Sequence, residues 1–275
     1  MASTLGLDLD ELLGLCAEVD AYYKPRQKPK ADGTFRQIDC PTGRLKTVQR
    51  RLHRRLLATC DPSGVAHGGV KGRSHITAAQ VHVGASSIGT LDIKGFFDSV
   101  SPDHVYSLLI DMGCSPDVAR IVTQLTTFEG HLAQGSPAST AIANLLLFAF
   151  DQAVERAAIK QGVSVTRVVD DVVFSGARSN VKALLSAARG ELFRIRLRPN
   201  RKKIAVMSDG QRKTVCNLNV SSDVSLPKGA SRSDRSKGRG LNRRDLRSRV
   251  RSAIRYGISE TDRERLAGQL YYARK

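Results

Sequence analysis

The hydrophobic positions of this chain follow two different spacings, which together indicate a mixture of helices and strands. An acidic segment that extends to about residue 21 has helical spacing, with one expected apolar face made of Leu9, Leu12, Leu13 and Cys16. Residues 28–39 instead alternate around Asp32-Gly33, a dipeptide typical of tight turns, and this predicts a β-hairpin. A basic amphipathic helix is expected after it, from about Leu45 to Leu57.

The middle of the chain predicts a mixed helix and strand domain. "IGTLDIKGFFDSV" predicts a strand that carries Asp92. Two helices are expected after it, and each begins with Ser-Pro-Asp, in which serine is the N-cap. "GSPASTAIANLLLFAFDQAVERAAIKQG" predicts one long, largely apolar helix, and "SVTRVVDDVVFSG" predicts a second hairpin with Asp170 and Asp171 at its tip. A helix over about 180–194 and a strand-turn-strand segment complete this part.

The last fifty residues have a different composition. "PKGASRSDRSKGRG" is typical of a linker, and the segment after it spaces Leu246, Val250 and Ile254 for one apolar stripe among arginines. Residues 226–275 hold roughly fifteen basic and five acidic groups, about half of the excess charge of the chain. A helix of this kind can pack on a body and bind phosphates. A solvated basic tail is the alternative.

The overall charge favours a polyanionic partner. The chain has 44 Lys+Arg against 26 Asp+Glu, a net charge of +18, in a sequence with 41% hydrophobic residues. A charge of this size is typical of proteins that bind nucleic acid. No apolar run approaches the roughly 20 residues that span a bilayer, and the five scattered cysteines include no C-x-x-C pair. We therefore expect a cytoplasmic protein with reduced thiols, without a zinc site and without a membrane partner.

Three carboxylates form the strongest chemical signal. A strand that ends near Asp92, beside a hairpin tip with Asp170 and Asp171, would bring three negative charges to one edge of a sheet. Such a group is unfavourable unless a cation neutralises it, and Mg²⁺ prefers oxygen ligands of this kind. Two ions about 4 Å apart could activate a hydroxyl and stabilise a leaving phosphate oxygen. Ordinary turn chemistry is the alternative explanation for Asp-Asp at a hairpin tip.

The order of these segments resembles the reverse transcriptases, which are RNA-directed DNA polymerases. "LDIKGFFDSV" is similar to their first palm motif, "QGSPAST" to the second, "VVDDVVFSG" to the catalytic hairpin and "RPNRKKI" to the motif after it. Two further segments resemble bacterial retron reverse transcriptases: "AHGGVKGRSHITAAQVHVG" and "RLAGQLYYARK". The resemblance implies an α/β (α+β) right-hand polymerase. Its expected parts are an N-terminal helix and fingers over 1–84, a palm over 85–222 with a fingers portion at about 115–134, and a short basic helical thumb over 223–275.

The resemblance also implies roles for individual residues. Asp92, Asp170 and Asp171 would be catalytic and would bind two Mg²⁺ ions, or Mn²⁺ as a substitute, with Ile93 beside them. Lys203 would assist the leaving pyrophosphate. The residues expected to bind the incoming nucleotide are Lys28, Arg36, Ile93, Phe97 and Gln134. Those expected to bind nucleic acid are Val168, Arg243, Arg244, Arg247 and Arg251. His82 is expected to be structural.

The implied biology is that of a retron enzyme. Such an enzyme copies part of its own structured RNA into DNA from deoxynucleoside triphosphates, starts from a 2′-hydroxyl, and makes branched RNA–DNA (msDNA). It commonly serves in antiviral defence with an effector protein, a toxin or a nuclease. This chain departs from the family pattern at Val168, where tyrosine is usual, and at Ala78, where asparagine is usual. The alternatives are an abortive-infection or other stand-alone defence reverse transcriptase, and a catalytically weak polymerase-like protein that only binds RNA.

Overall fold

The computed structural model describes residues 1–30 and 33–225, which divide into two compact units. The first unit consists of Met1–Gly64, Ile93–Ala153 and Glu191–Asn200. The second consists of Val65–Asp92, Val154–Gly190 and, within the described part of the chain, residues 201–225. The three-part division expected from the sequence stays a prediction, and nearly all of its thumb lies outside the described residues.

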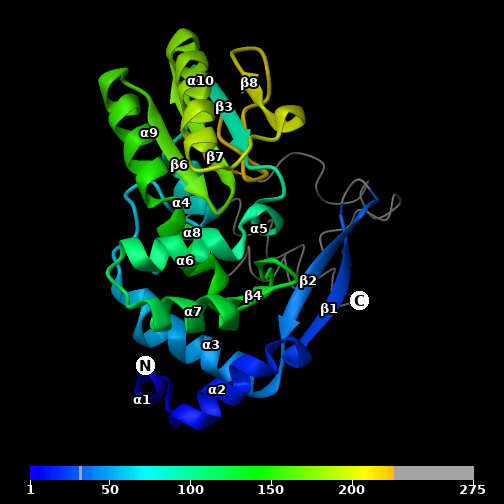
Figure 1. The fold of residues 1–275 in the computed structure, drawn as a ribbon. Coiled ribbons are helices and arrows are strands. Elements are labelled where there is room, and N and C mark those ends of the chain that lie inside the picture. Colours follow the sequence, from blue (N-terminus) through cyan, green and yellow to red (C-terminus); the bar gives the residue numbers. More distant parts are fainter. Residues whose placement is uncertain (31–32, 226–275) are drawn as a thin grey trace. The chain divides into compact units, whose positions relative to one another are not determined.

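An antiparallel sheet of four strands forms the centre of the second unit (Figure 1). Its strands are β3 (Ser87–Asp92), β6 (Ser164–Val168), β7 (Asp171–Gly176) and β8 (Ala205–Met207), in the order β6-β7-β3-β8. β6 and β7 are the two arms of the predicted hairpin, and β3 is the predicted strand that ends at Asp92. The hairpin is confirmed, and the strand is confirmed as far as Asp92, whereas the later residues of "IGTLDIKGFFDSV" include a helical turn, α5 (Phe96–Ser99).

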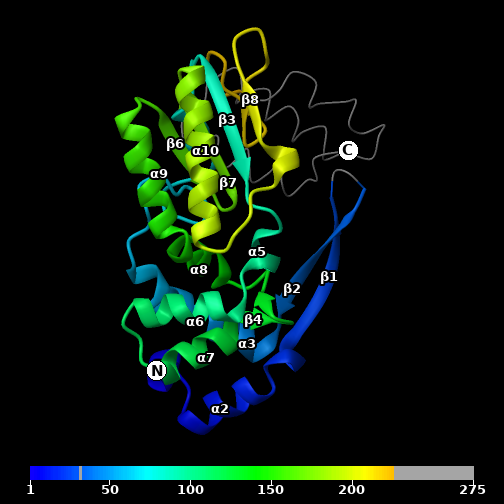
Figure 2. The ribbon, with the colours of Figure 1, turned by 45° about the horizontal axis from the view of Figure 1, so that its top comes forward.

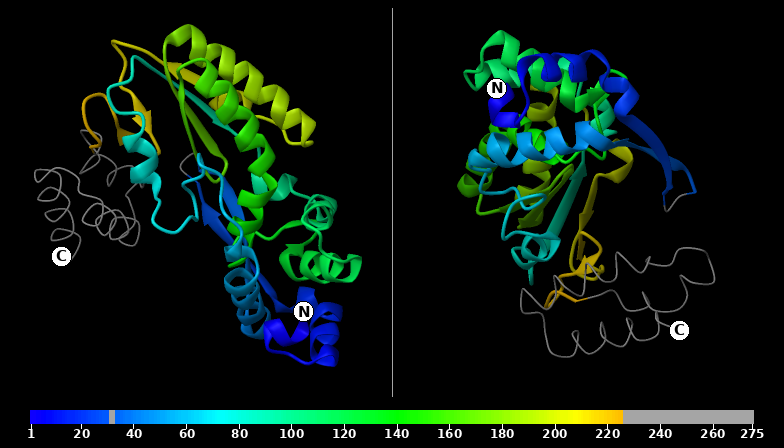
Figure 3. Two further views of the ribbon diagram at one scale, coloured as in Figure 1. Left: turned by 90° about the vertical axis from the view of Figure 1, so that its left-hand side faces the viewer. Right: turned by 90° about the horizontal axis from the view of Figure 1, so that it is seen from below.

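One face of this sheet packs against helix α10 (Arg178–Arg194), which lies along the strands in Figures 2 and 3. Gly89 of β3 allows the close approach, because a Cβ atom there would lie 2.6 Å from Cγ1 of Val181 and 2.9 Å from Cδ1 of Leu185. The predicted helix over about 180–194 is therefore present, and it begins two residues earlier.

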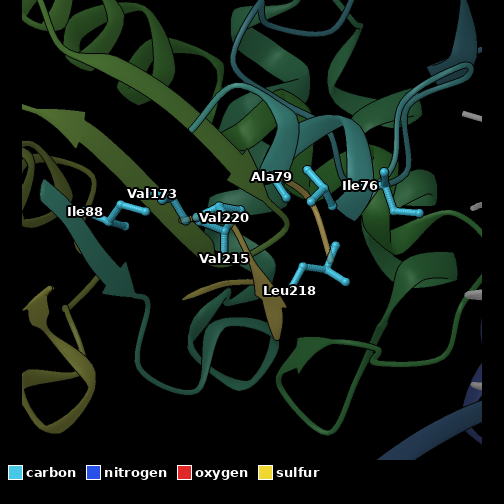
Figure 4. Packing of buried hydrophobic residues seen from close by; sticks show 8 residues of the cluster. Ile76, Ala79, Ile88, Val173, Val215, Leu218 and Val220 are labelled. Atoms are coloured by element: carbon cyan, nitrogen blue, oxygen red, sulfur yellow. The ribbon is translucent and has the colours of Figure 1, made fainter. Parts of the chain in front are cut away.

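The opposite face carries a small hydrophobic cluster, shown in Figure 4. Ile88 and Val173 come from the sheet, and α4 (His75–Gln80) contributes Ile76 and Ala79. β9 (Thr214–Val215) and β10 (Leu218–Asn219) form a hairpin with a two-residue turn, and Val215 and Leu218 of this hairpin belong to the cluster. Both residues of its turn have positive φ, 50° at Cys216 and 63° at Asn217, as a type I′ turn requires.

The first unit contains the predicted basic hairpin. β1 (Tyr23–Pro29) and β2 (Phe35–Pro41) pair along their whole length and form the long blue ribbon of Figure 3. The register places Lys28 opposite Arg36. The predicted basic helix follows as α3 (Gly43–Arg55), which buries Leu45, Val48 and Leu52.

The N-terminal prediction is only partly right. The segment forms two helices, α1 (Ala2–Leu5) and α2 (Leu9–Ala17), because α2 begins at a new capping box made by Asp8 and Glu11. The buried residues of α2 are Leu12, Leu15 and Cys16. Leu9 and Leu13, which were expected on the buried face, are 59% and 49% exposed.

The remaining helices of the first unit follow their sequence signals closely. α6 (Pro102–Asp111) and α7 (Pro116–Thr126) start at the expected serine caps. α5 (Phe96–Ser99) and the short strands β4 (Thr127–Phe128) and β5 (His131–Leu132) lie before and after them in the chain.

The expected single long helix is instead two helices. They are α8 (Ser139–Leu146) and α9 (Phe148–Lys160). The backbone at Leu147, with a ψ angle of 1°, departs from α-helical geometry and separates them. Among the residues that the structure describes, no helix is both long and apolar enough to cross a bilayer.

Candidate active site

Asp92 and Asp171 lie directly opposite each other on neighbouring strands. The register of β3 and β7 pairs the two residues, and the register of β6 and β7 pairs Asp171 with Val168. Residues that are paired in this way point to the same face of a sheet. Val168, Asp171 and Asp92 therefore form one row across three strands, on the face that also carries Ile88 and Val173.

The hairpin turn that carries Asp170 is unusual in its backbone. It consists of Val169 and Asp170, and Val169 has a φ of 61°. A β-branched residue rarely adopts positive φ, and such strain persists only where the surrounding structure holds it. One restraint is Arg167, which is fully buried and donates a hydrogen bond of 2.8 Å from Nη1 to the carbonyl oxygen of Val169.

A loop from the segment before α4 provides a second restraint on this turn. The backbone N–H of His67 donates to the carbonyl oxygen of Arg167, and the N–H of Arg167 donates to that of Val65, both at 2.7 Å. Gly68 then lies so close that a Cβ atom on it would be 2.6 Å from the nitrogen of Val169. No role was predicted from the sequence for Gly68 or Arg167. The Gly-Gly pair at 68–69 was the only signal for a close backbone approach.

Lys203 is placed where the sequence motif predicts a functional lysine. It ends a short 3₁₀ helix (Arg201–Lys203), and its Nζ lies 2.7 Å from Oδ2 of Asp92. The hydrogen bond with Asp92 is the main reason that the pKa of Lys203 is raised. The lysine side chain is more than half exposed, so the ammonium group keeps contact with solvent while it balances a nearly buried carboxylate.

The three carboxylates lie close enough to repel one another. The pKa of Asp171 is raised to about 6, first because burial removes water from its carboxyl group, and then because the charges of Asp170 and Asp92 are near. The ammonium group of Lys203 acts in the opposite direction. The residue as a whole remains exposed, so the desolvation concerns the carboxyl group at the sheet edge rather than a closed interior. The three acids do converge, as the sequence predicted.

The donor set at this edge suits a hard divalent cation. All three groups are carboxylates, and their mutual repulsion is the condition that a bound cation relieves. Within residues 1–30 and 33–225, no three His, Cys, Asp or Glu side chains are already arranged as a complete metal site. Asp92 instead has the Lys203 ammonium group beside it, so cation binding requires the side chains to rearrange.

His82 is a structural residue, as expected. It is fully buried, and its two ring nitrogens lie 2.7 Å from the hydroxyl oxygens of Ser175 and Thr166. These hydroxyls belong to β7 and β6, so the imidazole joins the two arms of the β6–β7 hairpin. Burial lowers the pKa of His82 to about 4, and the charge of His67 contributes to the shift.

The residues expected to bind the nucleotide belong to the first unit. Lys28 and Arg36 are exposed cross-strand partners on the β1–β2 hairpin. Phe96 is buried and Phe97 is partly exposed, and they lie in a helical turn rather than alternating along a strand. Gln134 lies in the loop before α8 and not at the start of the helix. Their roles stay predictions.

Two further groups of predicted residues complete the comparison. Ile93 is buried and forms a backbone bridge to Pro199, and its expected role beside the metal also stays a prediction. The arginines expected to bind nucleic acid, Arg243, Arg244, Arg247 and Arg251, lie outside the described residues.

Solved structures with a similar fold define the class of protein. A telomerase from Candida albicans, in complex with a TWJ fragment of telomeric RNA, matches 90% of this chain and 54% of its own with a TM-score of 0.56 and 11% identity. An apo telomerase from Candida tropicalis matches 83% of this chain and 51% of its own with a TM-score of 0.53 and 10% identity. At such identities the likeness concerns the fold alone. It confirms the predicted right-hand polymerase fold.

Sequence comparison identifies the family. Residues 28–235 match the family described as "Reverse transcriptase (RNA-dependent DNA polymerase)", and the chain belongs to this family. Its similar relatives include the retron Mx65 reverse transcriptase of Myxococcus xanthus, 32% identical over 88% of this chain and 63% of that protein. The retron Mx162 reverse transcriptase of the same organism is 30% identical over 78% of this chain and 51% of that protein. The chain thus spans about half to two-thirds of the length of these relatives.

Proposed function

We propose that this chain is an RNA-directed DNA polymerase of the retron type, with its catalytic centre at Asp92, Asp170 and Asp171. The observation that carries the proposal is the pairing of Asp92 with Asp171 on adjacent strands, with Asp170 in the turn between β6 and β7. Family membership and the retron relatives support the same reaction. In this reaction a primer hydroxyl attacks the α-phosphorus of a deoxynucleoside triphosphate, and pyrophosphate leaves.

The carboxylates and Ile93 would hold two Mg²⁺ ions. Reverse transcriptases use divalent metal ions, and bound ions of this kind stabilise both the attacking and the leaving oxygen of an in-line displacement. Lys203 would transfer a proton to the leaving pyrophosphate, because its ammonium group already lies at the carboxylate edge.

The nucleotide and the primer would be held by the other predicted residues. Lys28 and Arg36 would contact the triphosphate, Gln134 would contact the nucleotide, and the ring of Phe97 would exclude a ribose 2′-hydroxyl. Val168 would lie beside the primer end, because it shares a row with Asp171 and Asp92. The template would be a structured RNA, and the product would be branched RNA–DNA made for phage defence with an effector protein.

Primer extension with a carboxylate variant tests this proposal. Purified protein with Mg²⁺ or Mn²⁺, a primed RNA template and deoxynucleotides should extend the primer, and Asp170→Asn should abolish extension while RNA affinity stays within about twofold. Asp209→Asn is the matched control, since Asp209 is an exposed acid of the same unit that pairs with Lys213. Equal extension by Asp170→Asn and the wild type would exclude this site.

A further inference from the structure

A buried carboxylate at the base of the basic hairpin has no role in the reaction proposed above. Asp39 of β2 is only 1% exposed. Its Oδ1 accepts a hydrogen bond of 3.0 Å from Nε2 of Gln37, and its Oδ2 lies 3.0 Å from Nε2 of His131. The backbone N–H of Gln134 also donates to Oδ2, at 3.3 Å. The carboxylate therefore collects donors from the hairpin, from β5 and from the loop before α8.

Asp39 and Gln134 each donate a hydrogen bond to the other. The N–H of Asp39 donates to the carbonyl oxygen of Gln134 at 2.7 Å, while the N–H of Gln134 donates to the Asp39 side chain. Gly135 continues the contact, because a Cβ atom there would lie 2.8 Å from the carbonyl oxygen of Asp39. Gly135 also has a φ of 130°, a backbone angle that residues other than glycine rarely adopt. The Gln134–Gly135 backbone is thus held directly against β2.

The hairpin needs such an anchor. A two-stranded ribbon is marginally stable alone, and most residues of β1 are exposed. Arg36 lies three residues from Asp39 on the same strand, and Lys28 is its cross-strand partner. An anchor at Asp39 therefore fixes the position of these two cations relative to Gln134.

We propose that Asp39 is a positioning residue for the incoming nucleotide. It connects the hairpin that carries Lys28 and Arg36 to the loop that carries Gln134, so that the groups for the triphosphate and for the rest of the nucleotide are placed before binding. This inference rests on the nucleotide-binding roles proposed above. A buried carboxylate with three hydrogen-bond donors suits the task, because its two oxygens accept from three separate segments and so fix their positions relative to one another.

The effect of removing this carboxylate should appear in nucleotide binding. Asp39→Ala should raise the KM for deoxynucleotides by about tenfold, with a smaller change in kcat and unchanged RNA affinity, because preorganisation of the binding groups is lost. Asp39→Asn should raise this KM only roughly two- to fourfold, because the amide oxygen of the asparagine can still accept a hydrogen bond from the N–H of Gln134. Steady-state single-nucleotide incorporation measures both constants.

The control separates positioning from general stability. Val105→Ala removes buried methyl groups from α6 in the same unit, so it should lower the melting temperature and leave the KM unchanged. If Asp39→Ala does not fold, Asp39→Asn carries the test alone. A wild-type KM in the folded Asp39 variants would overturn the inference. An inactive wild type would instead contradict the proposed function, so the two failures are distinguishable.

Discussion

Replacing Gly68 by alanine tests whether the loop before α4 holds the Val169–Asp170 turn of the proposed catalytic centre in place. The new Cβ would lie 2.6 Å from the nitrogen of Val169 and 3.2 Å from the carbonyl carbon of Val168. Both are backbone atoms, so rotation of a side chain cannot relieve these two close contacts. Ordinary van der Waals contact begins at 3.4 Å, and the turn and the loop must therefore separate by about 0.8 Å. A misplacement of about 1 Å can reduce a rate about 100-fold.

We expect Gly68→Ala to reduce single-turnover incorporation by roughly ten- to a hundredfold at saturating nucleotide, without a comparable loss of RNA affinity. The loop itself should persist, because its backbone hydrogen bonds to Arg167 do not involve the new methyl group. Gly190→Ala in α10 is the control, since a Cβ atom there has no neighbour within 4 Å. Wild-type turnover in folded Gly68→Ala would show that the loop does not restrain the turn.

Two further predictions concern the same hairpin. His82 has a pKa of about 4 in the folded protein and about 6.5 in the unfolded chain. As the pH falls from 6.5 to 4, its imidazole is therefore protonated in the unfolded chain but not in the folded protein. Its contribution to the free energy of unfolding should fall by about 2 kcal/mol between pH 7.5 and 5. Burial also lowers the pKa of His67 to about 4, so urea denaturation of His82→Gln should show a decrease that is smaller than that of the wild type by the His82 contribution. Val168→Tyr should lengthen the product made per binding event with an enzyme trap present, because the ring would extend from the row beside Asp171. An unchanged length would mean that residue 168 does not touch the primer.

Local signals in the sequence were sufficient for most of the secondary structure near the site. Alternation and turn residues predicted both hairpins, and the serine caps predicted α6 and α7. The convergence of Asp92 with Asp170 and Asp171 followed from their places at strand ends. Leu9 and Leu13 were misplaced because their spacing alone does not reveal where a helix begins, and the Asp8 capping box divides the segment.

Long-range polar contacts could not be predicted in the same way. The bonds that join Asp39 to Gln134, and His82 to Thr166 and Ser175, connect residues about 90 positions apart in the chain. A single sequence contains no periodicity for such contacts, because each depends on how separate elements pack. The same limit applies to Gly68, whose closeness to Val169 depends on a loop that pairs with β6.

The β6–β7 hairpin shows why these unpredicted contacts are important for the proposed function. Two adjacent carboxylates and a valine with positive φ both oppose the observed turn. The turn is held by contacts from outside it, namely the buried guanidinium of Arg167 and the backbone of residues 65–68. His82 joins the two strands at Thr166 and Ser175, which lie two and four residue pairs beyond the pair of Val168 and Asp171. The local sequence of this turn does not favour the observed backbone conformation, so the position of Asp170 depends on the contacts that Arg167 and residues 65–68 make with the turn. Substitutions at these neighbours should consequently affect the rate of the chemical step more than they affect RNA binding.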